Sequence, residues 1–274
     1  MHTVKRRWDG IFALGLICIF IGAAVRAADD APLTKEQIKQ FLLTAKVIKS
    51  HESSKGVTHT SRLTLSNGTI THDASFQPID EHKPVMKLQS GTTVFNFVDS
   101  YKYNLAAYTL SEMLGIDDML PVYVERKWQG SMGSLSWWLP VTMDEADRVQ
   151  KKIQPPNQQA WNNQMYRVRV FDQLVDDTDA NLTNVLIGPD WQIWRIDFTR
   201  AFRTSKDLRN PADLVRCERH LCEKLKQLNG SEVAEKTKNY LTKEEVHALM
   251  TRRDKIVEHF DALIKEKGEE QVLY

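Results

Sequence analysis

The sequence has few cysteines, no excess of either charge and only one long apolar run. Three cysteines in 274 residues exclude a small fold built on many disulfides. Lysine and arginine number 37 and aspartate and glutamate 36, so no overall positive charge points to nucleic acid as a partner. The remaining composition, 42% hydrophobic and 27% charged, is that of a globular protein and excludes a disordered tail, collagen or a coiled-coil rod.

The apolar run lies near the N-terminus, over residues 11–25, and follows the basic segment from Lys5 to Arg7. Small residues at Val25 and Ala27 then form a cleavage site, so the whole is typical of a secretory signal peptide. We expect residues 1–27 to be removed and the rest to be periplasmic or secreted, without a membrane association of its own. An uncleaved signal anchor is the alternative, although a spanning helix needs about 20 apolar residues.

Two cysteines follow the expected signal peptide, Cys217 and Cys222. The stretch around them has a helical pattern, and residues five apart on a helix point in different directions. We therefore expect two free thiols on different faces of one helix. A disulfide would require the helix to break, and the spacing of these cysteines with His220 fits no familiar zinc site.

The first half of the remaining chain, residues 28–140, is predicted to be rich in strands. After a short helix capped by Thr34, five stretches alternate polar and apolar residues and one has apolar residues at helical spacing. The charged stretch 80–90 shows no period and is expected to be irregular. The strands are expected at 45–49, 58–65, 69–77, 121–128 and 135–139, and the long helix at 99–114 with Gly115 as its C-cap.

The second half, residues 141–274, is predicted to be mainly helical. Its one interruption is a small hairpin, over residues 185–197, with its turn at Gly188 to Asp190. A strand-rich lobe followed by a helical lobe is an α+β plan. The expected helices are 142–152, 158–175, 211–228 and 242–266.

Polar residues that suit phosphoryl transfer gather around this hairpin. An acidic loop contains Asp176, Asp177 and Asp179, Asn184 follows five residues after Asp179, and the hairpin is expected to bring Asp197 back beside the loop. Phosphoryl transfer needs one carboxylate near the attacking hydroxyl, and an asparagine and a second carboxylate to hold Mg²⁺. Asp179 suits the first role, as the catalytic residue, and Asn184 and Asp197 suit the second. A solvated acidic loop is the alternative, because Asp and Asn are common in turns.

The stretch from Asp179 to Asn184 is similar to the catalytic loop of the protein-kinase-like superfamily, and Asp197-Phe198-Thr199 resembles its metal-binding Asp-Phe-Gly. The chain looks most like the divergent branches: phosphatidylinositol 3- and 4-kinase-like, HipA-like and secreted-pathway kinases. The resemblance implies a two-lobe fold, with a β-rich N-lobe and a mainly helical C-lobe. It also implies ATP and Mg²⁺ or Mn²⁺ as cofactors, and an acceptor, protein or small molecule, that the sequence does not name.

Two positions depart from the pattern that this resemblance implies. The third N-lobe strand should carry a lysine for the nucleotide phosphates, and the next helix a glutamate that pairs with it. Gln77 and Asn104 stand there instead, so a neutral hydrogen bond would replace the ion pair without leaving a buried charge unpaired. The loop expected to cover the nucleotide, residues 51–57, has a single glycine, Gly56.

Two cations are candidates to replace the missing lysine. Lys87 could reach the nucleotide phosphates from another direction, or it could be a solvated surface residue. Arg200 could contact phosphate, or it could form an ion pair with the acidic loop. Trp137 and Trp138 would lie at the junction of the lobes, where an adenine ring is usually held, or they could belong to the core.

Three functions therefore stay open on the sequence alone. The first is an exported kinase-like phosphotransferase that uses Asp179, Asn184 and Asp197. The second is a pseudokinase, in which the same cleft binds nucleotide or a partner without turnover, as the loss of the lysine–glutamate pair would favour. The third is a metal-dependent phosphohydrolase that uses the carboxylates of the same loop without nucleotide.

Overall fold

The computed structural model describes residues 32–52, 60–87 and 91–274. The chain divides at Leu33, and the compact unit Thr34–Tyr274 contains all the elements discussed below. The expected signal peptide, residues 1–27, and the glycine of the nucleotide-covering loop, Gly56, lie outside the described residues. Within the described ranges no helix combines the length and the apolar character needed to cross a membrane.

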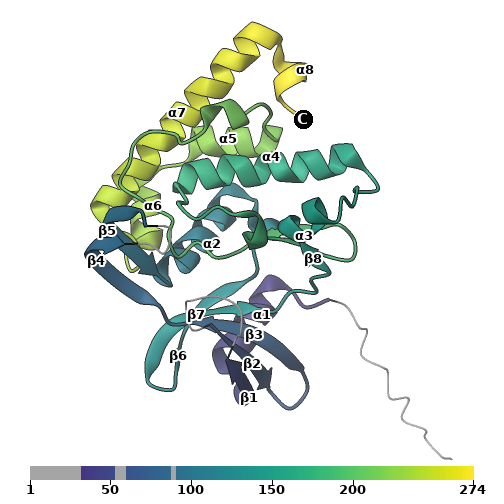
Figure 1. Cartoon of the computed structure of the whole chain (residues 1–274), viewed down its shortest axis with the longest axis vertical. Helices are drawn as coiled ribbons and strands as arrows, with labels where there is room; N and C mark the ends of the chain where they lie inside the picture. The colour runs from purple at the N-terminus through teal and green to yellow at the C-terminus, as the bar shows by residue number, and fades with distance from the viewer. Residues whose placement is uncertain (1–31, 53–59, 88–90) are drawn as a thin grey trace, which may run out of the picture. The chain divides into compact units, whose positions relative to one another are not determined.

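A five-stranded antiparallel sheet forms one half of this unit, in the order β1-β2-β3-β7-β6 (Figure 1). All five strands predicted from the alternating pattern are present, although several of their ends shift by a few residues. Strands that follow one another along the chain also pair with one another in the sheet, except that β3 pairs with β7. The strands are β1 (Lys46–Glu52), β2 (Ser61–Ser66), β3 (Thr71–Gln77), β6 (Tyr123–Trp128) and β7 (Ser131–Trp137).

The two faces of this sheet differ in polarity, because successive side chains of a strand point to opposite faces. Leu63 and Phe76 face the core and are buried. Two helices, α1 (Lys35–Thr44) and α2 (Lys102–Leu114), contact β6 and β7. The other face carries polar side chains in alternation with these, and Gln77 is among them.

Two short signals at the ends of these helices act as the sequence predicted. The Thr34 hydroxyl accepts a hydrogen bond from the Gln37 backbone, and the Gln37 side chain accepts one from the Thr34 backbone, which is a capping box. Gly115 ends α2 in the left-handed conformation, at φ 68°. The helix begins at Lys102, a few residues later than predicted.

The prediction of an irregular stretch over residues 80–90 was wrong. β4 (Asp80–Lys87) pairs antiparallel with β5 (Thr93–Ser100) as a separate two-stranded sheet. Most β4 side chains are at least partly exposed, so neither face of the pair offers the buried apolar alternation that identifies a strand in a sequence. Backbone hydrogen bonds join the end of β5 to the rest of the fold, from Ser100 N to Thr199 O, at 2.8 Å.

The other half of the unit is mainly helical (Figure 1). A three-stranded antiparallel sheet, in the order β10-β9-β8, lies within it and contains the predicted hairpin. The predicted α+β arrangement, a strand-rich half followed by a helical half, is confirmed. The elements are β8 (Met143–Asp144), α3 (Glu145–Gln150), α4 (Gln158–Val175), β9 (Val185–Ile187), β10 (Ile193–Arg195), α5 (Arg219–Gln227), α6 (Gly230–Thr237), α7 (Lys243–Lys267) and α8 (Glu269–Val272).

The predicted helix over residues 211–228, with both cysteines on it, is a second correction. A single 3₁₀ turn covers Pro211–Asp213, and α5 begins only at Arg219, so Cys217 precedes the helix. Cys217 lies instead in an extended segment that pairs with Leu273. Both thiols are free, as predicted, but they do not lie on different faces of one helix, because only Cys222 belongs to α5.

Candidate functional site

The acidic loop that follows α4 places Asp179 and Asn184 close together. The Asn184 amide nitrogen donates to the backbone carbonyl of Asp179, at 3.2 Å, which leaves the amide oxygen available as a metal ligand. Asn184 also accepts, through its backbone carbonyl, a hydrogen bond from Ile196 N at 3.0 Å. The hairpin of β9 and β10 thus returns the chain to the loop, as predicted, and Asp197 follows immediately.

Asp197 is a buried carboxylate in a constrained backbone conformation. Its φ is 60°, in the left-handed region that few residues other than glycine adopt and that recurs at functional sites. Burial raises the pKa of Asp197 above its usual range, although a hydrogen bond from the Thr199 hydroxyl, at 3.1 Å, acts in the opposite direction. The Gln77 amide also donates to Asp197, at 3.5 Å.

Gln77 and Asn104 form the neutral hydrogen bond that the sequence predicted. The Asn104 amide nitrogen donates to the Gln77 side-chain oxygen at 2.8 Å, and both side chains are buried. The Asn104 oxygen accepts the backbone N–H of Phe198, also at 2.8 Å, so α2 fixes the segment that carries Asp197. The pair therefore joins sheet, helix and acidic segment without any charge of its own.

A buried arginine stabilises the acidic loop through ion pairs. Arg195, at the end of β10, has no exposed surface and forms ion pairs with Asp172 of α4 and Asp177 of the loop. Asp177 in turn accepts the backbone N–H of Asp179 at 2.9 Å. Burial raises the pKa of Asp177 to about 6, against the opposing effect of the Arg195 charge. This network holds Asp179 at the surface of the site.

Arg200 forms two ion pairs and so links the acidic loop to β5. Its Nε donates to Asp99 at 2.9 Å, and its Nη1 donates to Asp179 at 3.1 Å. Its backbone carbonyl accepts the Thr178 hydroxyl at 3.0 Å. The ion pair with the acidic loop, one of the two alternatives that the sequence left open, is thus present in this structure.

The structure does not bring Lys87 to the other candidate residues. Lys87 is the last residue of β4, where it pairs with Thr93 in the separate two-stranded sheet. Lys87 does not line the cavity that lies between the large sheet and the hairpin of β9 and β10. An arginine that no sequence motif identified, Arg62, does line that cavity.

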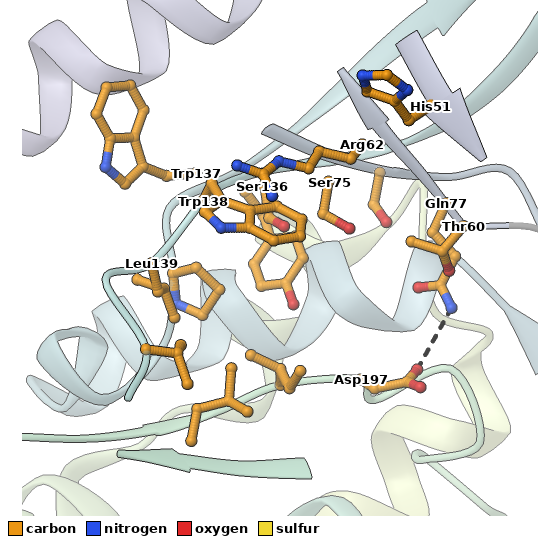
Figure 2. Close-up of a pocket in the computed structure, with 16 residues that line it drawn as sticks. His51, Thr60, Arg62, Ser75, Gln77, Ser136, Trp137, Trp138, Leu139 and Asp197 are labelled. Carbon is orange, nitrogen blue, oxygen red and sulfur yellow. Dashed lines mark hydrogen bonds between the residues drawn. The ribbon is translucent and has the colours of Figure 1, made fainter. Parts of the chain in front are cut away.

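A cavity of about 560 Å³ lies between the polar face of the large sheet and the hairpin of β9 and β10 (Figure 2). Gln77 and Asp197 mark one end of it, and Trp138 lies toward the other. Trp137 lines the cavity too, but its ring packs against Phe41. The remaining lining is His51, Thr60, Arg62, Ser75, Pro121, Tyr123, Ser134, Ser136, Leu139, Val141, Leu186 and Ile196.

Asp197 at one end of the cavity, and Asn184 on the segment that accepts a hydrogen bond from Ile196 N, carry oxygen atoms that suit Mg²⁺ or Mn²⁺. Asp197 offers a buried carboxylate and Asn184 an amide oxygen, and hard divalent cations prefer such ligands. Over the described ranges no group of three or more His, Cys, Asp or Glu side chains forms a metal site by itself. An ion held by these two residues alone would take its remaining oxygen ligands from a bound phosphate or from water.

Several residues of the site could not be identified from local sequence. Arg62, Asp99 and Arg195 act through ion-pair partners on other elements, and no local pattern in the sequence identifies those partners. One signal was present for Arg62. Arg62 comes directly before the buried Leu63 in β2, and successive side chains of a strand point to opposite faces. Arg62 therefore faces away from the core, on the same side of the sheet as Gln77.

No protein-family model matches the chain, and no curated protein sequence does either. Solved structures do. The structure of hydra Fam20 with a sugar superposes with a TM-score of 0.64 over 89% of this chain and 93% of that one, at 14% identity. A Golgi casein kinase gives a TM-score of 0.60 over 87% of this chain and 78% of that one, also at 14% identity.

These likenesses show the fold. The five-stranded sheet with α2 corresponds to a kinase N-lobe, and the helical half corresponds to a C-lobe. At 14% identity the comparison does not extend to activity or to individual residues. The chain has the two-lobe α+β fold of protein-kinase-like structures, as its catalytic-loop resemblance predicted.

Proposed function

We propose that the chain is an exported kinase-like phosphotransferase. It binds ATP, or a related nucleoside triphosphate, with Mg²⁺ or Mn²⁺ in the cavity and passes the γ-phosphate to an acceptor that carries a hydroxyl group. The observation that carries this proposal is Asp197 at one end of a cavity in a kinase-like fold, on a segment that hydrogen-bonds through Ile196 N to Asn184, whose side chain in turn bonds to Asp179. The signal peptide expected at residues 1–27 supports a site of action outside the cytoplasm.

Each residue has a role in this proposal. Asp197 and Asn184 hold the divalent cation, which neutralises charge on the phosphates. Asp179 orients the acceptor hydroxyl and accepts its proton. The acceptor oxygen forms a bond to the γ-phosphorus as the bond to the β-phosphate oxygen breaks, and the nucleoside diphosphate leaves.

The cavity departs from an ordinary kinase at the phosphate end. Gln77 provides an amide where a lysine would stand, and Arg200 is engaged with Asp99 and Asp179. Loss of one preorganised electrostatic contact typically costs about 10²–10³ in rate. We therefore expect slow turnover, unless Arg200 exchanges Asp179 for a phosphate when nucleotide binds.

Turnover tests this proposal directly. The full chain is incubated with ATP and Mn²⁺, and mass spectrometry follows nucleoside diphosphate formation and phosphate incorporation into the chain. Asp179→Asn should lower the rate about 10²–10⁴-fold, because it removes the proton acceptor and keeps the shape. Asp190→Asn, at the far turn of the same hairpin, is the matched control and should leave the rate unchanged. Equal rates in wild type and Asp179→Asn would contradict the assigned role.

A pseudokinase is the second candidate, and the neutral Gln77–Asn104 bond favours it. In that case the chain binds nucleotide without turnover, and Asp179→Asn does not change the amount of nucleoside diphosphate formed, because wild type forms none. Hydrolysis of simple phosphate esters with metal but without nucleotide would instead identify the phosphohydrolase.

A further inference from the structure

The end of the cavity away from Asp197 is lined by polar side chains on its sheet side. Arg62, Ser75 and Ser136 lie directly opposite one another on β2, β3 and β7, so they form one row across the sheet. Leu186 and Ile196 line the facing side. A base that lay flat on this row would cover its hydroxyl groups without giving them partners, so a base held here must turn its polar edge toward the sheet. The row therefore suits a ligand that presents polar atoms to the sheet.

Arg62 is held in one orientation by its neighbours. Its Nε and Nη2 both donate to one carboxylate oxygen of Asp73, with the Nε bond at 2.7 Å. The other Asp73 oxygen accepts the Thr64 hydroxyl at 2.6 Å. The guanidinium carbon lies 4.3 Å from the centre of the Trp138 ring, so the aromatic face fixes its plane (Figure 2).

This arrangement leaves one edge of the guanidinium for a ligand. A guanidinium has five N–H donors in a planar fork, and Asp73 uses the edge formed by Nε and Nη2. The edge formed by Nη1 and Nη2 presents the remaining donors, and no described residue bonds Nη1. Because Arg62 lines the cavity, this edge can meet a ligand that carries two adjacent hydrogen-bond acceptors.

The backbone carbonyls at this end already accept hydrogen bonds. The Trp138 N–H donates to the Asp73 carbonyl at 3.1 Å, and the Trp138 carbonyl accepts Nε2 of His72 at 3.0 Å. His72 is stacked on Trp137, with ring centres 3.5 Å apart, and Pro140 has no N–H. The Leu139 carbonyl also accepts Val141 N at 3.0 Å, so the main chain between the lobes offers few free acceptors to the amino group of an adenine ring.

We propose that Arg62 reads the base of the bound nucleotide and that the preferred base is guanine. Guanine presents O6 and N7 as adjacent acceptors, which a guanidinium fork binds with two parallel hydrogen bonds, whereas adenine has an amino donor in place of O6. The inference rests on the proposed nucleotide site and names its specificity. Asp73, Thr64 and Trp138 are positioning residues for Arg62.

Calorimetric titration tests this inference without any need for turnover. The full chain with Mn²⁺ is titrated with the β,γ-imido analogues of GTP and ATP. We expect the guanine analogue to bind about 5- to 150-fold more tightly, which is the range for one bidentate contact between arginine and guanine. Equal binding, or tighter binding of the adenine analogue, overturns the inference and leaves the proposed function intact. No binding of either analogue overturns both.

Three variants separate reading of the base from attraction to phosphate. Arg62→Leu should abolish the preference for guanine, and Arg62→Lys should abolish most of it, because lysine keeps the charge without the fork. Asp73→Asn should reduce it by loosening Arg62. If Arg62→Leu weakens both analogues by the same factor, Arg62 contacts phosphate and the inference is wrong. Circular dichroism of each variant without ligand confirms that the fold is retained.

Discussion

At the scale of single residues, the site depends on a charged network that has little contact with water. Arg195 is fully buried and forms ion pairs with the carboxylates of Asp172 and Asp177. Its guanidinium carbon also lies 4.9 Å from the centre of the Phe198 ring. A buried cation left without its partners would be strongly destabilising. The network therefore fixes both the loop that contains Asp179 and the segment that follows β10.

The pKa of Asp177 leads to a prediction about pH. Burial raises this pKa to about 6 in the folded state, from 3.8 for the ordinary carboxyl. Between these values the folded chain keeps a proton that the unfolded chain has released, so the contribution of Asp177 to stability is full below pH 4 and is lost as the pH rises through 6. Relative to Asp177→Asn, wild type should lose about 2 kcal/mol of unfolding free energy between pH 4 and pH 7.

Urea denaturation of wild type and Asp177→Asn at a series of pH values measures this difference. The exposed Asp213 provides the control variant, Asp213→Asn, because it lies in a 3₁₀ turn outside the network. A wild-type stability that rises relative to Asp177→Asn over the same pH range would show that the ion pair with Arg195 outweighs the cost of burial.

Residues that act through a local motif could be predicted, and those that act through distant partners could not. Asp179, Asn184 and Asp197 lie within one loop and one hairpin, so their spacing alone predicted that the loop and the end of the hairpin lie side by side. The partner of Arg62 is Asp73 on the neighbouring strand, and that pairing requires the register of the sheet. The local pattern contains no information about register when the face in question is polar.

At the scale of elements, the approach of β7 to β3 decides the position of Gln77. Gly133 of β7 lies so close to β3 that an added Cβ would stand 2.7 Å from the Gln77 carbonyl oxygen and 2.8 Å from the Phe76 ring. Neither the backbone nor a buried ring can move away cheaply. This glycine is therefore required for close packing of the strands.

Gly133→Ala should destabilise the fold by about 1–3 kcal/mol, which is the usual cost of extra volume in a packed interior. It should also weaken nucleotide binding, because β3 must shift and carry Gln77 with it. Chemical denaturation and a nucleotide titration measure the two effects. Ser131→Ala, at an exposed position of the same strand, is the control. Unchanged stability in Gly133→Ala would mean that the two strands are not tightly packed there.

Elements with a buried apolar face could be predicted, and elements without one could not. α4 was predicted over its full length because its apolar residues recur at helical spacing. β4 and β5 were missed because most of their side chains are at least partly exposed and follow no apolar alternation. The segment around Cys217 was taken for a helix because pairing with Leu273, over fifty residues away, leaves no local signal.

At the scale of the whole molecule, the two-lobe plan places a cavity where the two lobes meet. Strands first and helices afterwards predicted this α+β plan from the sequence. The solved kinase-like structures confirm the fold at 14% identity, a level at which the core layout is shared and site residues are not assured. Function must therefore be argued from the cavity and the residues around it.

Ligand binding should stabilise the whole molecule if the cavity is a nucleotide site. A ligand that binds only the folded state at about 100 times its Kd adds about 2.7 kcal/mol, which corresponds to roughly 5–10 °C in Tm for a chain of this size. The most direct measurement is a thermal-shift titration of the full chain with GTP or ATP, with and without Mn²⁺, beside Asp197→Ala. We predict a rise in Tm that requires Mn²⁺ and is lost in Asp197→Ala. No rise in Tm at millimolar nucleotide, or an equal rise in Asp197→Ala, would contradict the proposed nucleotide site.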